Sequence, residues 1–407
     1  MLIVMKFGGT SVANAERINN VAMRIKRSYM AGNKIAVVLS AQGDTTDELI
    51  EKAKEINPSP SKREMDMLLA TGEQQSVALM SMALDRIGVP SISMNANQCH
   101  IYATCDYSNA RIKDINCRRI FNELDSKKVV IVTGFQGVNN RGDVVTLGRG
   151  GSDTSAVALA AKLSADMCEI YTDVDGVYTG DPRIIKHAKK LKEISYDEML
   201  EFASLGAQVL HNRSVELAKK YGVNLVVRSS LTDAPGTIVK EETNVESMLI
   251  SGVAVDKNVS RISLIGVDDK PGTAYKLFSE LAKKNVSVDI ILQSIGRDGK
   301  KDISFTVARS DLSEALTALE NIKNKINFQS LDHKEDVAKV SIVGAGMATN
   351  AGVASLFFEA TYNAGVNVNM ISTSEIKISI LVNEKDADYA ANAIHDKFMS
   401  QSADLRH

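Results

Sequence analysis

Residues 2–11 have the sequence LIVMKFGGTS, which joins a short apolar run to a glycine pair and two hydroxyl side chains. Leu2 to Phe7 has the length and β-branched content of a buried strand, and amphipathic helical spacing begins near Ala15. Glycines after a strand let the backbone approach a ligand, and free N–H groups at a helix start attract an anion. Lys6 adds a positive charge. The stretch predicts a strand–loop–helix unit with an anion site, although the glycine pair alone is also compatible with a simple turn.

The alternation of strand and helix continues to about Val239. Short runs rich in β-branched residues predict strands at Leu2 to Phe7, Lys34 to Ser40, Val129 to Gly134, Glu169 to Thr172 and Asn224 to Arg228. Apolar residues at helical spacing predict helices such as Ala15 to Ala31 and Met65 to Ile87. Helices between strands act as crossover connections, so this part of the chain is predicted to be α/β with a mainly parallel sheet.

The pattern breaks near residues 232–237, and an internal repeat follows. VSRISLI at 259–265 and VAKVSIV at 337–343 each begin a copy with the order strand, helix, strand, strand, helix, strand. That order describes a ferredoxin-like α+β unit. We therefore predict an α/β domain over residues 1–241 and two small modules over residues 242–330 and 331–407. Small sheets with helices on one face associate side by side, so the modules either only join subunits or also bind a small effector between them.

A second glycine-rich stretch, LGRGGSDTS at residues 147–155, precedes an alanine-rich helix. Its glycines permit close backbone approach, and Ser152, Asp153 and Thr154 are residue types that cap a helix start. A cap needs only one such residue, and Arg149 offers a guanidinium fork suited to a carboxylate. The stretch therefore favours a ligand site over a cap alone.

Three further polar groups complete the pattern. TDVDGVYTGDPR at residues 172–183 follows a predicted strand, and its carboxylates and arginine suit a nucleotide with its magnesium. SAQGDTT at 40–46 leaves another strand, and TGE at 71–73 lies in the predicted helix after Met65. Loops at the carboxyl ends of strands in one open α/β sheet meet at one crevice, so we expect these groups to form a single site.

Charge and hydropathy exclude two classes of partner. The formal net charge of −2 provides no basic face for nucleic acid, and no run of eighteen apolar residues predicts a membrane helix. The apolar run at Leu2 to Met5 is too short for a signal peptide, so the expected location is cytoplasmic. No cysteine or histidine spacing indicates a metal site, and no metal ligand is assigned.

Together these motifs resemble the aspartate kinases of the amino-acid kinase family. KFGGTS at 6–11, TGE at 71–73, GRGGSD at 148–153, TDVDGVYTGDPR at 172–183 and the repeated modules occur in the family's order over nearly the whole chain. The resemblance implies a three-layer sandwich followed by two ACT modules, in a monofunctional enzyme. It also implies transfer of the ATP γ-phosphoryl group to the β-carboxylate of L-aspartate. The product, 4-phospho-L-aspartate, would begin the route to lysine, threonine and methionine.

The same resemblance assigns roles to individual residues. Lys6 and Asp153 would be catalytic, with Lys6 also contacting the transferring phosphoryl group. The aspartate would be bound by Thr45, Glu73, Arg149, Gly151 and Ser152, with Glu73 receiving the ammonium. ATP, with Mg²⁺, would be bound by Lys6, Gly8, Gly9, Thr10, Thr172, Asp173, Tyr178, Asp181, Pro182 and Arg183.

For the ACT modules, the resemblance implies an effector amino acid, lysine or threonine or both. In the first copy the effector residues would be Asp269, Lys270, Pro271, Gly272, Ser287, Asp289 and Gln293. In the second they would be Met347, Asn350, Gly352, Ser372, Thr373 and Ser374. That copy has TNAG where the first has DKPG, so it lacks the acidic residue that would bind an effector ammonium. Effector binding is therefore expected mainly at the loops of the first copy. The modules also imply a homo-oligomer, and Met248 is a possible internal start for a separate regulatory subunit.

Two other functions stay open on the residues. Another amino-acid kinase could act on glutamate or N-acetylglutamate, but an acetylated substrate has no ammonium for Glu73. The chain could also be a catalytically silent amino-acid sensor, but a sensor does not need Lys6, Arg149 and Asp153 together. A nicotinamide dehydrogenase is disfavoured because no G-x-G-x-x-G follows the first strand.

Overall fold

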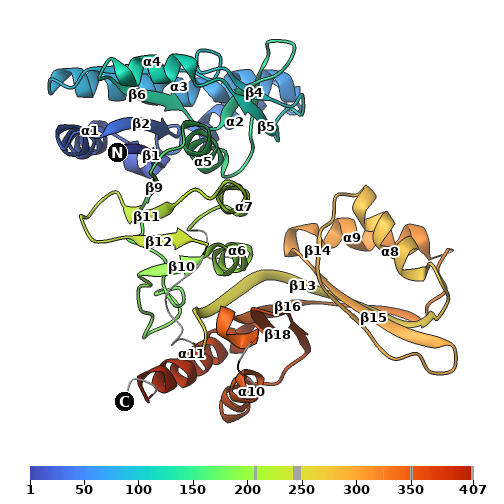
Figure 1. Cartoon of the computed structure of the whole chain (residues 1–407). Coiled ribbons are helices and arrows are strands. Elements are labelled where there is room, and N and C mark those ends of the chain that lie inside the picture. Colours follow the sequence, from blue (N-terminus) through green and yellow to red (C-terminus); the bar gives the residue numbers. More distant parts are fainter. Residues whose placement is uncertain (206–208, 242–248, 324, 349, 351, 405–407) are drawn as a thin grey trace. The chain divides into compact units, whose positions relative to one another are not determined.

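The computed structural model describes the chain except residues 206–208, 242–248, 324, 349, 351 and 405–407 (Figure 1). The predicted internal start at Met248 lies outside the described residues. The chain divides into two compact units, one of residues 1–177 and 190–244 and one of residues 178–189 and 245–407. The second unit thus includes residues 178–189, a segment within the predicted α/β domain.

The first unit is built on a sheet that is mainly parallel, as predicted. Its strands are Leu2–Phe7 (β1), Lys34–Leu39 (β2), Ser91–Met94 (β3), Val129–Thr133 (β6), Met167–Thr172 (β9), Glu193–Ser195 (β10), Leu225–Ser229 (β11) and Thr237–Lys240 (β12). They lie in the order β10-β12-β11-β9-β1-β2-β6-β3, and only the β11–β12 pair is antiparallel. The carboxyl ends of β9, β1, β2 and β6 therefore lie side by side at one edge.

Helices flank this sheet. They are Gly9–Val12 (η1), Ala15–Met30 (α1), Thr45–Ile56 (α2), Lys62–Arg86 (α3), Arg118–Asp125 (α4), Gly151–Leu163 (α5), Tyr196–Ser204 (α6) and Asn212–Tyr221 (α7). Alternate strand residues such as Met5, Phe7 and Val37 share one buried core with α1 and α3. Side chains alternate between the two faces of a strand, so α4 and α5, which pack on the same strands, cover the other face. The result is the three-layer arrangement that the resemblance implied.

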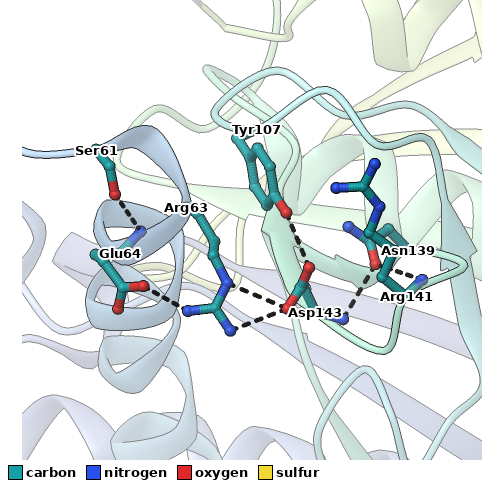
Figure 2. Close-up of polar contacts among 7 residues, drawn as sticks. All are labelled: Ser61, Arg63, Glu64, Tyr107, Asn139, Arg141 and Asp143. Atoms are coloured by element: carbon teal, nitrogen blue, oxygen red, sulfur yellow. Dashed lines mark hydrogen bonds and ion pairs between the residues drawn. The ribbon is translucent and has the colours of Figure 1, made fainter.

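A small second sheet, which the sequence did not predict, extends the first unit. It has the order β5-β4-β7-β8, from Ile112–Ile115 (β5), Ile101–Ala103 (β4), Gln136–Val138 (β7) and Val144–Thr146 (β8). A polar cluster ties the β7–β8 turn to the start of α3. Figure 2 shows Asp143 accepting hydrogen bonds from Arg63 and from the Tyr107 hydroxyl, the latter at 2.8 Å. These bonds hold the pKa of Asp143 below its usual range, the bond from Tyr107 contributing most.

The second unit is one six-stranded antiparallel sheet with the order β14-β15-β13-β16-β18-β17. Its elements are Gly252–Asp268 (β13), Thr273–Lys283 (α8), Val288–Gln293 (β14), Lys300–Val307 (β15), Arg309–Asp311 (η2), Leu312–Ile322 (α9), Ser330–Val343 (β16), Ala345–Ala348 (η3), Val353–Asn363 (α10), Met370–Thr373 (β17), Lys377–Asn383 (β18), Glu384–Asp386 (η4) and Ala387–Asp404 (α11). The long strands β13 and β16 run side by side at its centre (Figure 1).

Each of these two long strands serves both modules. Residues 260–268 of β13 pair with β15, whereas residues 252–256 pair with the end of β16. Separate hydrophobic cores lie under the two halves of the sheet, one around Phe305 and one around Phe357. The two repeats are therefore distinct modules that share their central strands. The first is formed by a continuous stretch from the second half of β13 to the start of β16, whereas the second combines the start of β13 with the chain from the end of β16 onward.

Most predicted elements lie within two or three residues of their observed bounds, but one strand is shifted. In the second copy of the repeat, the run VNVNM at residues 366–370 predicts the strand that follows the first helix, but the strand lies at Met370–Thr373. Gly365 has φ +65°, and pairing with β18 begins only at Met370 opposite Leu381. The partner strand, rather than the β-branched content of residues 366–368, decides where this strand starts.

Candidate functional site

The loops that follow β1, β2, β6 and β9 carry most of the predicted site residues, and they meet at the carboxyl edge of the sheet. Gly9 accepts a hydrogen bond from the Gly43 N–H, and Gly8 donates one to the Tyr171 carbonyl at the end of β9. Gly134, directly after β6, donates to the Leu39 carbonyl at the end of β2. Backbone contacts therefore join four loops that are distant in sequence.

Lys6 and Asp153 form an ion pair at the centre of this edge. Lys6 Nζ lies 2.7 Å from Asp153 Oδ1, and both side chains are only about one-eighth exposed. Asp153 lies in the first turn of α5, where the helix dipole favours a negative charge. The pair joins the glycine loop after β1 to the glycine-rich stretch that begins α5.

Three glycines let these elements approach one another. A Cβ on Gly9 would lie 2.7 Å from the Ala41 carbonyl oxygen, and one on Gly134 would lie 2.6 Å from Ser152 Oγ. A Cβ on Gly72 of α3 would lie 2.8 Å from Ala41 Cβ and 3.5 Å from Thr45 Cγ2. Thr45, Ser152 and Glu73, the neighbour of Gly72, are thus brought to the same edge as Lys6.

Glu73 is a buried carboxylate with an unused oxygen. Its side chain is 3% exposed, and Oε1 accepts a hydrogen bond of 3.0 Å from the Ala41 N–H. Among the described residues, no group bonds Oε2. Burial raises the pKa of the Glu73 carboxyl to about 7, although the bond from Ala41 acts in the opposite direction. A buried carboxylate of this kind is stabilised by a cation, which is what an ammonium ligand would supply.

Arg149 lies on the loop before α5. The next residue, Gly150, caps the start of that helix in a left-handed conformation at φ +66°. The residue is exposed, and within the described part of the chain no side chain pairs with its guanidinium. A free guanidinium beside Gly151 and Ser152 is suited to a carboxylate ligand.

Asp66 is a positioning residue that the sequence analysis missed. It is fully buried on α3 and accepts hydrogen bonds from the N–H and side-chain O–H groups of Ser108 and Thr146. Thr146 ends β8, three residues before Arg149. An acidic residue two helical turns before Glu73, among apolar neighbours, was the available signal.

The predicted nucleotide residues fall into two groups. Thr172 and Asp173 follow β9 in the first unit, where the Thr172 hydroxyl donates to Asp173 Oδ1 at 2.9 Å. Tyr178, Asp181, Pro182 and Arg183 belong to the second unit. There Arg183 pairs with Asp181 at 2.7 Å, and this bond lowers the pKa of the Asp181 carboxyl.

Segment 178–189 is anchored within the second unit. The Thr179 carbonyl accepts a hydrogen bond of 2.8 Å from the Val253 N–H, and its hydroxyl bonds the buried His395 Nε2, also at 2.8 Å. The second part of the stretch predicted to bind the nucleotide, from Tyr178 onward, therefore belongs to the same compact unit as the ACT modules.

The predicted effector residues lie at loops and strand ends of the second unit. Asp269 pairs with Lys301 at 2.8 Å, Lys270 pairs with Asp268, and Asp289 on β14 bonds Lys339 on β16. Gly272 and Gly352 have φ of +86° and +122° directly before α8 and α10. Of the remaining predicted residues, Ser287, Gln293, Ser372, Thr373 and Ser374 lie on or next to β14 and β17. Pro271 lies in the turn before α8, Met347 on η3, and Asn350 between η3 and α10.

Among the described residues, no helix is both long and apolar enough to cross a membrane. In the same part of the chain, no group of three or more histidine, cysteine, aspartate and glutamate side chains is placed to hold a metal ion.

Comparison with known proteins agrees with this geometry. The model of the amino acid kinase family matches residues 1–229, and that of the ACT domain matches residues 262–322 and 340–398. An aspartokinase of Corynebacterium glutamicum is 48% identical over 403 residues, covering 98% of this chain and 96% of the relative. One of Helicobacter pylori is 48% identical over 400 residues, covering 97% of this chain and 98% of the relative.

Solved structures give the same result. Aspartokinase III of E. coli in complex with aspartate and ADP matches with a TM-score of 0.82 and 25% identity, covering 98% of this chain and 100% of that one. The same enzyme in complex with lysine and aspartate matches with a TM-score of 0.79 and 26% identity, covering 98% and 99%. The chain therefore belongs to the aspartokinases, within the amino acid kinase family, and carries ACT domains in its C-terminal part.

Proposed function

We propose that this chain transfers the γ-phosphoryl group of ATP to the β-carboxylate of L-aspartate, giving 4-phospho-L-aspartate and ADP. The observation that carries the proposal is the convergence of Lys6, Asp153, Ser152, Thr45 and Glu73 at one edge of the sheet. Membership of the aspartokinases supports the same reaction. One relative, aspartokinase III of E. coli, has been solved with aspartate and ADP.

The chemistry needs alignment more than proton transfer. A carboxylate is ionised at neutral pH and attacks the γ-phosphorus directly, so no strong general base is required. Lys6 Nζ provides a positive charge for the oxygens of the transferring phosphoryl group, and Asp153 fixes its position at 2.7 Å. The N–H groups of Gly9 and Thr10 would support the phosphates, whereas that of Gly8 donates to the Tyr171 carbonyl and Gly8 would contribute by its close backbone approach. Positioned donors of this kind each contribute roughly 10²- to 10³-fold to turnover.

Substrate choice would follow from the two ends of aspartate. Arg149 and Ser152 suit a carboxylate, while the free Oε2 of Glu73 suits an ammonium. An N-acetylated amino acid offers no ammonium and would leave the buried Glu73 unpaired. A site built to pair one charged group rejects an analogue that lacks it. This favours a free amino acid over an N-acetylated one.

We infer that magnesium enters with the nucleotide. The described residues contain no protein cage for a metal, and Mg²⁺ in phosphoryl-transfer sites is usually held by one or two carboxylates together with substrate phosphates. Asp173, exposed after β9, is a carboxylate that could supply one ligand. When bound, the ion would neutralise phosphate charge; Thr172 and Asp173 would hold the nucleotide in place.

The C-terminal part is proposed to bind lysine, threonine or both at the loops around Asp269 and Asp289 and at their counterparts in the second module. A lysine complex of E. coli aspartokinase III supports an amino-acid effector. The unit that contains these loops also contains Tyr178–Lys189, so the effector loops share one compact unit with four of the predicted nucleotide residues, Tyr178, Asp181, Pro182 and Arg183. An effector inhibits only if it binds the less active state better.

Association through the ACT half is part of the proposal. The two edge strands of its sheet expose apolar side chains, including Ile291 on β14 and Ile371 on β17, and Ile295, two residues after β14, is exposed as well. Unpaired edges with apolar residues are surfaces on which a second copy can pair.

The test is trapping of acyl phosphate with hydroxylamine, using purified protein, ATP and Mg²⁺ with L-aspartate, L-glutamate or N-acetylglutamate. The proposal predicts hydroxamate from aspartate alone, and suppression by lysine, threonine or their mixture. Hydroxamate from another substrate only would contradict the aspartate assignment. Full activity in millimolar lysine plus threonine would contradict the regulatory one.

A further inference from the structure

A cavity of about 320 Å³ lies between α1 and the loop after β11, within the first unit. It is lined by Ser11, Arg17, Asn20, Val21, Met23, Arg24, Arg27, Ser230, Leu231 and Asp233. The residues assigned above to aspartate and to ATP are not among them. Its volume is at the lower end of the range for small-molecule sites.

Three arginines of α1 line this cavity at positions 17, 24 and 27. Their charges are opposed by one lining carboxylate, Asp233, which lies 2.9 Å from both Arg24 and Arg27. Within the described residues, no carboxylate pairs with Arg17. The lining therefore keeps a net charge of +2 with Asp233 in place, which favours a doubly charged anion over a monocarboxylate.

Arg24 is held as a rigid binding group. Its guanidinium lies over the Tyr171 ring at 5.1 Å, and it donates to the Thr232 carbonyl at 2.9 Å. A guanidinium fixed in this way loses little freedom when it binds an oxyanion. Tyr171 in turn stacks on Phe7, so this part of the cavity wall is continuous with the sheet core.

Ser11 provides an independent indication of a ligand. Its side chain is 2% exposed and lines the cavity, yet Oγ has no hydrogen-bond partner among the described residues. A buried hydroxyl without a partner is costly, and an anion oxygen in the cavity would satisfy it. Val21, Met23 and Leu231 give the same cavity an apolar part.

We propose that this cavity is a second ligand site, separate from the catalytic site, which binds a small phosphate monoester. The phosphate would be bound by Arg17, Arg24 and Arg27 with the Ser11 hydroxyl, and its organic part would contact Met23 and Leu231. Arginine forks match phosphate oxygens in pairs, and the apolar residues distinguish an ester from the bare ion.

The test is calorimetric titration of the full-length chain at constant ionic strength, with glycerol 3-phosphate and with inorganic phosphate. Three variants are compared: Arg17→Gln removes a binding charge, Asp233→Asn removes the competing carboxylate, and Arg118→Gln is a control. Arg118 is exposed on α4 and absent from the cavity lining. Thermal unfolding of each variant establishes that it is folded.

The proposal predicts that glycerol 3-phosphate binds tighter than inorganic phosphate, and that saturating ADP with Mg²⁺ leaves its binding intact. Arg17→Gln should weaken binding roughly tenfold or more, because a charge-assisted hydrogen bond is lost. Asp233→Asn should tighten it, and Arg118→Gln should leave it unchanged. Absence of binding to the wild type, equal binding by Arg17→Gln, or full displacement by ADP would overturn the proposal. Equal affinity for both probes would contradict the monoester assignment.

Discussion

Glu73 is the residue whose environment most clearly selects a ligand. It is buried, one of its oxygens is unused, and burial raises its pKa to about 7. Only the ionised form attracts an ammonium, so substrate affinity should depend on pH near neutrality. At pH 6 a group of pKa 7 is about one-tenth ionised, and at pH 8 about nine-tenths.

We therefore expect the KM for aspartate to fall by up to about tenfold between pH 6 and pH 8. Glu73→Gln should raise the KM at pH 8 by at least this factor and remove its pH dependence. Steady-state kinetics across this range measures both effects. An unchanged KM profile in Glu73→Gln would show that the ammonium binds elsewhere.

The stability of the same variant separates binding from folding. Folding raises the pKa of the Glu73 carboxyl from its ordinary value of 4.5 to about 7. Its burial therefore costs no stability below pH 4.5. The cost grows between pH 4.5 and about 7 and is complete above that pH. Glu73→Gln removes the ionised form, so at pH 8 it should unfold at a temperature no lower than the wild type. If Glu73→Gln instead lost much stability at pH 8, its kinetic defect would be a result of misfolding.

At the scale of elements, α3 positions the loop before α5 through Asp66. This buried carboxylate accepts four hydrogen bonds from Ser108 and Thr146, and Thr146 precedes Arg149 by three residues. The nearby Arg63–Asp143 pair joins α3 to the same hairpin, but Arg63 is about half exposed. Buried hydrogen bonds to a charged group contribute more than an exposed ion pair.

Asp66→Asn should therefore lower the free energy of unfolding by about 1–3 kcal/mol and raise the KM for aspartate. Arg63→Gln, the matched exposed change, should alter stability by less than about 1 kcal/mol and leave the KM unaffected. Denaturant unfolding and kinetics on both variants test the difference. Equal effects in the two variants would mean that Asp66 has no special positioning role.

The elements also show what the sequence could and could not predict. The strands before Gly8, Ser40 and Gly134 were predictable because apolar β-branched runs end there in glycine or serine. The convergence of Lys6 with Asp153 followed from the rule that ligands bind at the carboxyl ends of parallel strands. The Asp66 network could not be predicted, because its partners lie 42 and 80 residues away. The shifted strand at Met370–Thr373 depends likewise on its partner strand, β18.

At the scale of the whole molecule, the ACT half has two exposed strand edges. Ile291 and Ile295 at one edge are 51% and 92% exposed. If this edge pairs with a second copy, Ile291→Asp together with Ile295→Asp should shift the protein to a smaller species in light scattering after gel filtration. The control is Ile56→Asp on α2, where the side chain is 89% exposed; this change should leave the mass of the protein unaltered. An unchanged mass in the first variant would exclude this edge as the interface.

Domain organisation at this scale was only partly readable from the sequence. The repeat itself is visible in residues 259–265 and 337–343. The sharing of β13 and β16 between the modules is not visible, because similar sequences in the two copies do not show which strands pair with each other. The assignment of Tyr178–Lys189 to the second unit depends on contacts such as Thr179 with His395, 216 residues apart.

The measurement that tests the central claim most directly is ³¹P NMR of ATP, Mg²⁺ and L-aspartate with the wild type and with Lys6→Ala. The account predicts that the wild type produces ADP together with an acyl phosphate that hydroxylamine removes. Lys6→Ala should produce it roughly 10²- to 10³-fold more slowly while remaining folded. Release of inorganic phosphate without an acyl phosphate, or full activity of Lys6→Ala, would contradict it.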